Sequence, residues 1–299
     1  MSLDETTVRT LVSGQFPEWA GRPVRRVRSH GTVNTIFRIG DDLTARFPRL
    51  PATTPEPAEA EKIRRQIEAE AYAAEHLYGR TRFRTPAPVA IGTAAPEFPL
   101  PWSVQTWLPG TVATDDDPGD SALFAADLVE LITAMRAVGT GGAVFSGRGR
   151  GGVLAGHDEW MRTCFAHSER LLDVPRLRSL WDKMRGLPRG SDPDVMSHQD
   201  LMPGNLLVAG GRLTGVLDVG GFGPADPALD LLSAWHLLEP GPRDVLRAGL
   251  SCDDAEWARG QAWAFEQSMG LVWFYEHSNP VMAGIGRRTL DRILADPAV

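Results

Sequence analysis

An acid and an amide stand five residues apart in the segment SHQDLMPGNLL, residues 197–207. Asp200 and Asn205 flank a Pro-Gly pair, which indicates a loop, and the apolar run that begins at Leu206 predicts a strand. A carboxylate on a loop can accept a proton from a hydroxyl, and an amide oxygen can bind a hard cation such as Mg²⁺. The segment therefore favours general-base chemistry beside a metal site.

A second carboxylate follows this strand. The segment NLLVAGGRLTGVLDV, residues 205–219, predicts a hairpin that turns at 209–211, and Asp218 ends its second strand. Because a hairpin returns to where it began, we expect Asn205 and Asp218 to lie close together. Two such oxygen ligands suit Mg²⁺, which fills its shell with water and phosphate oxygens. Each residue taken singly is more typical of a turn or a strand end, but with Asp200 as base the set meets the needs of phosphoryl transfer.

The elements that must position these residues fall into two halves. Apolar or alternating runs predict strands at 23–29, 34–40, 43–48, 87–92 and 101–108, and helical periodicity predicts helices at 3–16 and 58–79. Beyond Pro109-Gly110, helices are predicted at 120–138, 157–173, 176–186, 225–238, 254–276 and 284–295, with the hairpin as the one interruption. We therefore expect an α+β fold with a β-rich lobe at 1–108 and a mainly helical lobe at 109–299.

The composition excludes several classes of protein. The 299 residues are 42% apolar and 23% charged, as in an ordinary globular protein, and no apolar run reaches the roughly 18–20 residues of a membrane span. The net charge of −7 argues against a general nucleic-acid binder. Cys164 and Cys252 lack paired spacing, and residues 1–16 lack the features of a signal peptide. We expect free thiols and a cytoplasmic protein without nucleic-acid or membrane partners.

The segments HQDLMPGN and GVLDVGGFGPADPALDL together resemble the Brenner-type motif and metal-binding segment of the aminoglycoside phosphotransferase and choline kinase family. The shared pattern is His-x-Asp, four residues, Asn, and then an apolar strand that ends in Asp. The resemblance covers nearly the whole chain and implies a protein-kinase-like, two-lobe fold. It also implies that Asp200 is the catalytic base, that Asn205 and Asp218 bind Mg²⁺, and that ATP is the phosphate donor.

Three other residues of these segments are expected to have structural roles. His198 is expected to hold the catalytic loop by hydrogen bonds. Asp226 stands before a proline and is expected to cap the next helix, whereas Asp230 would tether the catalytic loop.

A kinase fold needs a cation on its third strand to bind the α- and β-phosphates, paired with a carboxylate on a helix. The chain has only two lysines: Lys62 lies in the predicted helix and Lys183 far downstream. Arg46 is the one cation in the strand LTARFP, so we expect it to take this role. Its expected partner is Glu70, with Glu68 as the alternative.

The rest of the nucleotide site is expected at two places. The segment SHGTVNT, residues 29–35, joins the first two strands, and Gly31 and Asn34, with Ser29 and Thr32, are expected to contact the phosphates. The N-terminal lobe should end in a hinge at QTWLPG, where the Thr106 carbonyl and the Leu108 amide would meet the adenine.

The acceptor is the least specified part of the prediction. An acidic chain suits a cationic acceptor, and the glycine-rich segment at 139–156, which carries Arg148 and Arg150, is interpreted as a flexible surface loop or a substrate lid. We therefore predict an ATP- and Mg²⁺-dependent kinase for a hydroxyl of an aminoglycoside-like antibiotic, which would imply a resistance role, or of another amino-bearing metabolite. The alternatives are a macrolide, choline or sugar kinase and a nucleotide-binding pseudokinase, with a metal-dependent phosphohydrolase as a weaker option.

Overall fold

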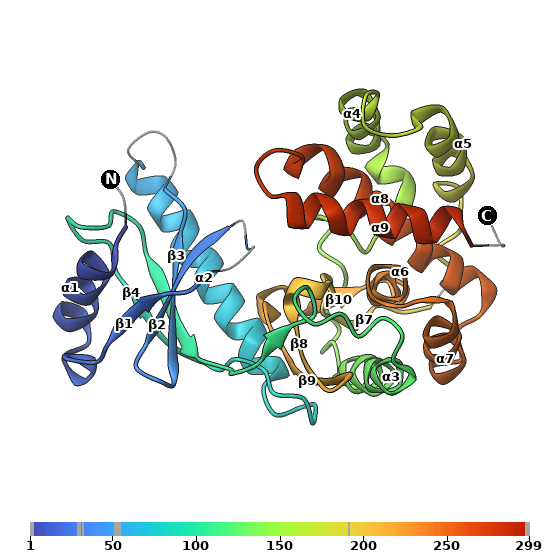
Figure 1. Ribbon diagram of the computed structural model, residues 1–299. Coiled ribbons are helices and arrows are strands. Elements are labelled where there is room, and N and C mark those ends of the chain that lie inside the picture. The colour runs from blue at the N-terminus through green and yellow to red at the C-terminus, as the bar shows by residue number, and fades with distance from the viewer. Residues whose placement is uncertain (1–2, 29–30, 32, 51–54, 191, 297–299) are drawn as a thin grey trace. The chain divides into compact units, whose positions relative to one another are not determined.

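The computed structural model describes residues 3–28, 31, 33–50, 55–190 and 192–296 (Figure 1). The chain divides into two compact units. Unit 1 comprises Met1–Gly79, Arg84–Pro109 and Val216–Gly221, and unit 2 comprises Arg80–Phe83, Gly110–Gly215 and Phe222–Val299. The short segment that carries Asp218 therefore belongs to unit 1, whereas Asp200 and Asn205 belong to unit 2.

Unit 1 is built on an antiparallel sheet with the strand order β1-β2-β3-β5-β4. The strands are β1 (Val24–Arg26), β2 (Asn34–Ile39), β3 (Leu43–Pro48), β4 (Pro88–Gly92) and β5 (Trp102–Thr106). On β3, Ala45 and Phe47 are fully buried on one face, so the alternation of the strand directs Arg46 to the other face. The predicted strands of this half are confirmed.

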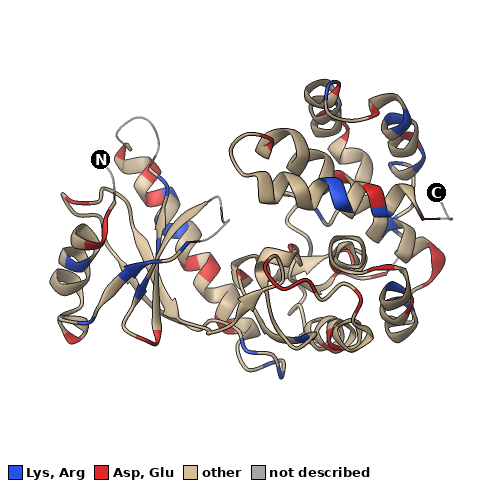
Figure 2. Cartoon of the chain, viewed as in Figure 1, with Lys and Arg blue, Asp and Glu red and all other residues tan. Residues whose placement is uncertain are grey.

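Two helices accompany this sheet, α1 (Glu5–Gln15) and α2 (Pro57–Leu77), and a 3₁₀ turn follows α1 at Pro17–Trp19. The core of the unit is aromatic: Phe47 stacks on Trp102 with ring centroids 4.7 Å apart, and Phe98 meets Phe47 edge-on. Charged residues follow one another along α2 (Figure 2), where Arg64 pairs with both Glu61 and Glu68. These pairs stabilise the exposed side of the helix.

Unit 2 is mainly helical. Its helices are α3 (Ala122–Arg136), α4 (Asp158–Ser168), α5 (Val174–Met184), α6 (Ser233–Leu237), α7 (Pro240–Leu250), α8 (Asp254–Tyr275) and α9 (Pro280–Leu294). Helices α8 and α9 lie side by side (Figure 1), and residues 259–272 of α8 are buried all round. A helix that is buried on every face belongs to the core of its unit. Among the described residues, no helix combines the length and apolar character that a membrane crossing requires.

Short strands flank the loop of unit 2 that carries Asp200. The strand β7 (Val195–Ser197) pairs with β10 (Gly223–Ala225), and β6 (Thr111–Val112), β8 (Leu206–Ala209) and β9 (Arg212–Val216) form a second sheet. The turn between β8 and β9 has Gly210 and Gly211 at φ 56° and 68°. Two consecutive left-handed residues are what a type I′ hairpin turn requires, and glycine adopts them without strain. The predicted hairpin is confirmed.

The prediction of a single helix over 225–238 is wrong. The chain there runs from β10 through a turn at Pro227 into a 3₁₀ turn at Leu229–Leu232 and only then into α6. Pro224 and Pro227 have no backbone N–H, so a regular helix cannot form across them. The helix α7, which was not predicted, begins at Pro240 with a second proline at 242, and prolines in a first turn obscure the helical pattern.

Asp226 forms a buried ion pair in addition to the backbone hydrogen bond expected of a helix cap. Its side chain is 0% exposed and pairs with Arg259, which is 4% exposed, with Nε 3.0 Å from Oδ2 and Nη2 3.2 Å from Oδ1. Asp226 Oδ1 also accepts from the amide of Ala228 at 3.0 Å, as expected of a cap. The residue therefore joins a buried ion pair on α8 to the turn that follows β10.

Replacing Asp226 by Ala leaves the guanidinium of Arg259 buried without its counter-ion. We expect Asp226→Ala to lower the free energy of unfolding by about 3–5 kcal/mol, the usual cost of breaking a buried ion pair. Loss of a cap alone would cost only about 0.5–2 kcal/mol. Urea unfolding followed by circular dichroism measures the difference.

The matched control is Asp254→Ala. Asp254 also pairs with an arginine, Arg247, but its side chain is 99% exposed, and exposed pairs contribute about 0.2–1 kcal/mol. Equal losses of stability in the two variants would contradict the role given to the Asp226–Arg259 pair.

Candidate active site

Asp200 lies in the loop that leaves β7. Within this loop Gln199 adopts a left-handed φ of 71°, which is uncommon for a residue with a side chain. The loop is held by Asp230, whose carboxylate accepts from the amides of His198 at 3.1 Å and Gln199 at 3.0 Å. His198 is buried, and its Nδ1 accepts from the amide of Asp200 at 3.3 Å. The structural roles predicted for Asp230 and His198 are confirmed.

The Asp200 carboxylate accepts three hydrogen bonds. Its Oδ1 accepts from Gln267 Nε2 at 2.6 Å and from Arg150 Nη2 at 3.1 Å, and its Oδ2 accepts from Asn205 Nδ2 at 3.0 Å. Asn205 lies at the end of a 3₁₀ turn, Pro203–Asn205, and its Nδ2 also bonds to the backbone oxygen of Asp200 at 2.9 Å. The structure thus brings Asp200 and Asn205 together and adds two donors that sequence reasoning did not assign.

Gln267 is itself held by a buried relay. Its Oε1 lies 3.0 Å from His236 Nε2, and His236 Nδ1 lies 2.9 Å from the Thr289 hydroxyl oxygen. Because the Gln267 amide nitrogen faces the Asp200 carboxylate, its oxygen faces His236, and Nε2 must carry the imidazole proton. Nδ1 is then left as an acceptor that faces the Thr289 hydroxyl, which also lies 2.9 Å from the carbonyl oxygen of Ile285. The relay fixes the side-chain amide that orients Asp200.

A second group of charges adjoins the Asp200 carboxylate. Glu266 is 4% exposed, and its Oε1 lies 2.8 Å from His157 Nδ1. His157 Nε2 lies 3.2 Å from the carbonyl oxygen of Gly149. Both partners of His157 are acceptors, so both hydrogen bonds form only when the imidazole carries two protons. The bond to Glu266 accordingly raises the pKa of His157 above its ordinary value.

In unit 1, Arg46 pairs with Asp218, with Arg46 Nη2 2.8 Å from Asp218 Oδ1. We expected Glu70 or Glu68 as the partner of Arg46. Glu68 instead pairs with Arg64 one turn earlier on α2, and Glu70 Oε1 accepts from Gln66 Nε2 at 3.0 Å. Neighbours on the same helix therefore bind both glutamates.

Asp218 stands in a strained turn that α2 supports. Its φ of 54° is left-handed, which costs free energy for a residue other than glycine. Two residues later, Gly220 lies against the side chain of Glu70: an added Cβ would be 2.8 Å from Glu70 Cγ. Only glycine permits this approach. Glu70 therefore packs on the segment that carries Asp218.

The other described residues predicted to bind the nucleotide lie at or near the ends of strands in unit 1. Asn34 opens β2 opposite Pro48, and Gly31 is exposed. Thr106 ends β5, where its amide donates to the carbonyl of Ala87 at 2.9 Å, and Leu108 is buried. Ser29 and Thr32 lie outside the described residues. The nucleotide contacts of these residues stay predictions.

The oxygen atoms offered by Asn205 and Asp218 fit Mg²⁺. Asp218 is half exposed, and Asn205 uses its amide nitrogen on Asp200, which leaves its Oδ1 as the side-chain atom for a cation. Among the described residues, no group of three or more His, Cys, Asp or Glu side chains is suited to a metal ion. Two hard oxygen ligands are what Mg²⁺ takes when water and phosphate complete its shell.

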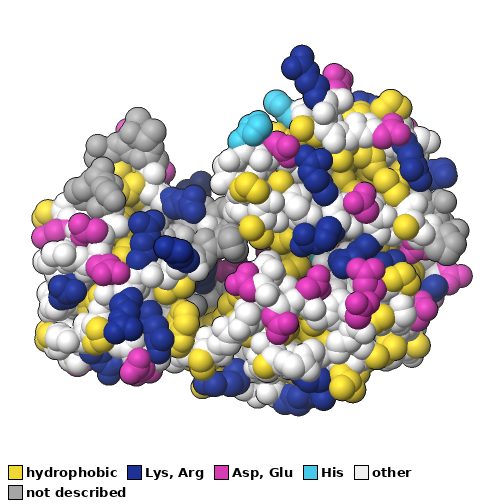
Figure 3. Space-filling model, in the orientation of Figure 1, with side chains coloured by type: hydrophobic (Ala, Val, Ile, Leu, Met, Phe, Trp, Pro, Cys, Tyr) yellow, Lys and Arg dark blue, Asp and Glu magenta, His cyan; other side chains and the backbone are white. Residues whose placement is uncertain are grey.

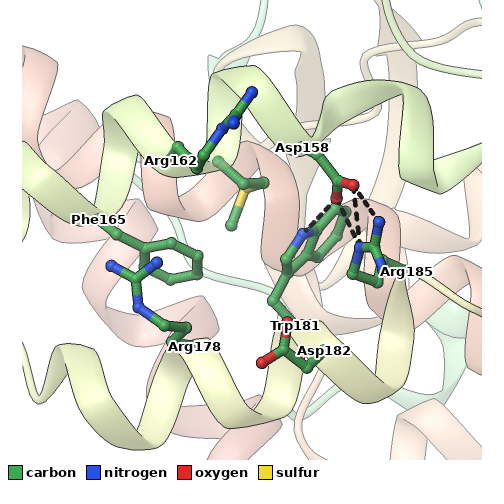
Figure 4. A pocket seen from close by; sticks show the side chains of 8 residues that line it. Asp158, Arg162, Phe165, Arg178, Trp181, Asp182 and Arg185 are labelled. Atoms are coloured by element: carbon green, nitrogen blue, oxygen red, sulfur yellow. Dashed lines mark hydrogen bonds and ion pairs between the residues drawn. The ribbon is translucent and has the colours of Figure 1, made fainter.

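A pocket of about 330 Å³ opens between α4 and α5 (Figure 4). Asp158 accepts there from Trp181 Nε1 at 3.0 Å and from Arg185, and the guanidinium of Arg178 lies over the ring of Phe165 at 4.7 Å. Asp158 is thus engaged with Arg185 and Trp181, and Arg178 with Phe165. Among the described residues, none of those predicted for the active site lines this pocket.

Several acidic side chains of unit 2 that could attract a cationic acceptor have structural partners instead. Asp253 caps α8 by accepting from the amide of Glu256 at 2.7 Å, and Glu256 pairs with Arg136. Asp117 accepts from the amide of Gly119 at 2.9 Å. Basic and acidic side chains are interspersed on the face shown in Figure 3. These acidic side chains therefore serve a helix cap, an ion pair and a turn.

Comparison with known proteins places the chain in a family. Residues 24–263 match the family described as the phosphotransferase enzyme family, APH. Because this match spans most of the chain, the protein belongs to that family. An aminoglycoside 3'-phosphotransferase from Escherichia coli is 43% identical over 61 residues, which are 20% of this chain and 22% of that enzyme. The chain thus matches about a fifth of the length of this relative.

Solved structures share the fold over nearly the whole chain. The GDP complex of wild-type aminoglycoside 2'-phosphotransferase-IIIa superposes with a TM-score of 0.68 at 15% identity and covers 98% of this chain and 99% of its own. Macrolide 2'-phosphotransferase MphH from Brachybacterium faecium, as the apoenzyme, gives 0.61 at 17% identity, with 94% and 97% covered. The predicted family and the α+β, kinase-like fold are confirmed.

The relay behind Asp200 makes stability depend on pH. Burial lowers the pKa of His236 to about 3, so the folded protein keeps it neutral while the unfolded chain binds a proton below its ordinary pKa of roughly 6.5. Stability from this group is therefore lost as the pH falls below that value, by about 1.4 kcal/mol per pH unit. Urea unfolding at pH 7, 6 and 5 measures this slope.

His236→Gln is the control because it removes the titrating group and keeps a hydrogen-bonding side chain. We expect its unfolding free energy to fall less steeply with decreasing pH than that of the wild type, which isolates the contribution of His236 from other histidines. The same pH slope in both proteins would refute the assignment of a buried, neutral His236.

Proposed function

We propose that this protein transfers the γ-phosphate of ATP, with Mg²⁺, to a hydroxyl of a small molecule. The observation that carries the proposal is the environment of Asp200, a partly buried carboxylate on a tethered loop with Asn205 bonded to it. It stands in a chain that belongs to the phosphotransferase enzyme family. In this proposal residues 1–108 form the nucleotide-binding lobe and residues 109–299 the acceptor lobe.

Asp200 is suited to act as the general base. Its Oδ2 accepts one hydrogen bond, from Asn205, and a carboxylate oxygen can accept two, so this atom can also accept the proton of an acceptor hydroxyl. Gln267 and Arg150 fix the other oxygen. In-line transfer requires such positioning of the attacking oxygen more than covalent help from the protein.

The Arg46–Asp218 pair is suited to a magnesium nucleotide. Arg46 would hold the α- and β-phosphates, and Asp218 with Asn205 would hold Mg²⁺, which when bound neutralises charge on the phosphate oxygens. A guanidinium and a carboxylate side by side complement the alternating charges of that ligand. ATP as donor is supported by a streptomycin–ATP ternary complex of APH(2")-IIa, which shares the fold with a TM-score of 0.60 at 14% identity over 97% of both chains.

We propose an aminoglycoside-like or other amino-bearing acceptor, which the Escherichia coli relative and the net charge of −7 support. An antibiotic acceptor would make the protein a resistance enzyme, and we place the reaction in the cytoplasm, where ATP is available. A macrolide is the second candidate. It is favoured by the charge balance at Asp200, where Arg150 and His157 offset Asp200 and Glu266 and leave no local excess of negative charge among these four groups.

The proposal predicts transfer of labelled γ-phosphate from Mg-ATP to at least one member of an acceptor panel. The panel comprises kanamycin, gentamicin, streptomycin, a macrolide, choline and amino sugars. Asp200→Asn keeps the shape of the side chain and should reduce kcat on the order of 10² to 10⁴ with little change in the KM for ATP. Retention of more than about a tenth of the wild-type kcat would show that Asp200 is not the base.

The role proposed for Arg46 predicts that its loss weakens the binding of ATP more than the binding of adenosine. Arg46→Ala should weaken ATP binding by about 10- to 150-fold, because charge-assisted hydrogen bonds contribute roughly 1.5–3 kcal/mol each, and should leave adenosine binding nearly unchanged. Isothermal titration calorimetry resolves both. Arg46→Lys should recover part of the loss, because a point charge replaces a planar fork.

Arg25→Ala is the matched control, since Arg25 is an exposed arginine on β1 of the same sheet. Its affinity for ATP should equal that of the wild type. Equal weakening of ATP and adenosine by Arg46→Ala would indicate damage to the sheet instead of a lost phosphate contact.

A further inference from the structure

The glycine-rich segment at 139–156 is fixed on both sides of Arg150. The carbonyl oxygen of Gly149 is held by His157, and that of Gly151 accepts from the amide of Asp226 at 2.9 Å. Gly151 has φ 110°, and an added Cβ would lie 2.8 Å from the Cβ of Ala225. The backbone at Arg150 is therefore packed against β10 and does not form a free surface loop.

The guanidinium of Arg150 lies between two carboxylates. Its Nη2 is 3.1 Å from Asp200 Oδ1, and its Nη1 is 4.0 Å from Glu266 Oε2. Glu266 Oε2 is buried and accepts no hydrogen bond among the described residues. Among the residues that the structure describes, Arg150 is the one cationic side chain that is hydrogen-bonded to the carboxylate of Asp200. Arg150 therefore lies between the buried carboxylate of Glu266 and the carboxylate of Asp200, the proposed base.

Phosphoryl transfer is favoured by a cation close to the phosphoryl oxygens. The attacking oxygen would lie within about 2.6–3.2 Å of Asp200, and the charge that develops spreads over the three equatorial oxygens of the phosphoryl group bonded to it. A guanidinium that contacts the same carboxylate is within reach of those oxygens. The catalytic segment 197–207 itself contains no lysine or arginine.

We propose that Arg150 is a catalytic residue that stabilises the transferring phosphoryl group, an inference that rests on the proposed function. In the step, the acceptor oxygen forms a bond to the γ-phosphorus and the bond from that phosphorus to the bridging oxygen of ADP breaks. The hydroxyl proton passes to Oδ2 of Asp200. Protonation removes the negative charge that Arg150 balances, so the guanidinium then pairs with the phosphoryl oxygens while Glu266 keeps it in place.

Steady-state kinetics tests this role with the acceptor that gives turnover in the panel. Arg150→Ala should lower kcat by about 10²-fold or more, as loss of a transition-state donor does, and change the KM values for ATP and acceptor by less than about threefold. Arg150→Lys should recover part of kcat because it keeps the charge beside Glu266, and it remains testable if the alanine variant does not fold. Arg148→Ala, an exposed arginine two residues away in the same segment, is the matched control and should behave as the wild type.

A binding measurement separates this inference from the proposed function. ADP with Mg²⁺ and aluminium fluoride, which mimics a planar phosphoryl group, should raise the thermal midpoint of the wild type above the value with Mg-ADP alone. Arg150→Ala should lose that increment and keep the Mg-ADP shift. No acceptor is required for this readout, so a wild type that phosphorylates nothing in the panel contradicts the proposed function while the role of Arg150 is still decided.

Three results would overturn the role given to Arg150. A kcat in Arg150→Ala equal to or above that of the wild type would show that the ion pair only blocks the base. A raised KM for the acceptor with unchanged kcat would make Arg150 an acceptor contact. The third result concerns the rise in thermal midpoint that aluminium fluoride adds to Mg-ADP. If the wild type lacks this rise, or if Arg150→Ala keeps it, Arg150 does not contact the phosphoryl group.

Discussion

The carboxylate of Asp200 is partly withdrawn from water and is surrounded by hydrogen-bond donors. A charge that is withdrawn from water is tolerated only when hydrogen bonds and a counter-ion replace its hydration. Here the replacements come from three separate segments: Arg150 from the glycine-rich segment, Asn205 from the 3₁₀ turn and Gln267 from α8. One carboxylate therefore joins three segments of unit 2.

Helix α8 serves as the common support for these groups. Its consecutive residues Glu266 and Gln267 face the two sides of the network, with Glu266 bonded to His157 and Gln267 to Asp200. Because α8 is buried all round, neither side chain can turn into solvent. Charged and amide groups held in this way need little reorganisation when charge moves during a reaction, which is how proteins stabilise transition states electrostatically.

Sequence reasoning identified the parts of the site that local patterns encode. Asp200 and Asn205 share one segment, and the alternation of β3 placed Arg46 on the face opposite Ala45 and Phe47. Gln267 was missed because α8 has no polar stripe from which a functional side chain stands out. Contacts between distant segments carry no local pattern either, so the partner of Arg46 and the fixing of the backbone around Arg150 required the structure.

If unit 1 binds the nucleotide as proposed, the Arg46–Asp218 ion pair would select among its ionic forms. Arg46 and Asp218 neutralise each other, and Asp218 reaches its position through a left-handed turn that is supported by the contact of Glu70 with Gly220. A bare polyphosphate that displaced Asp218 from Arg46 would face an unpaired carboxylate and be repelled by it. A magnesium nucleotide offers an anion to Arg46 and a cation to Asp218 at once. Under the proposed function, the pair would therefore favour the metal complex of the nucleotide over the free polyphosphate by charge.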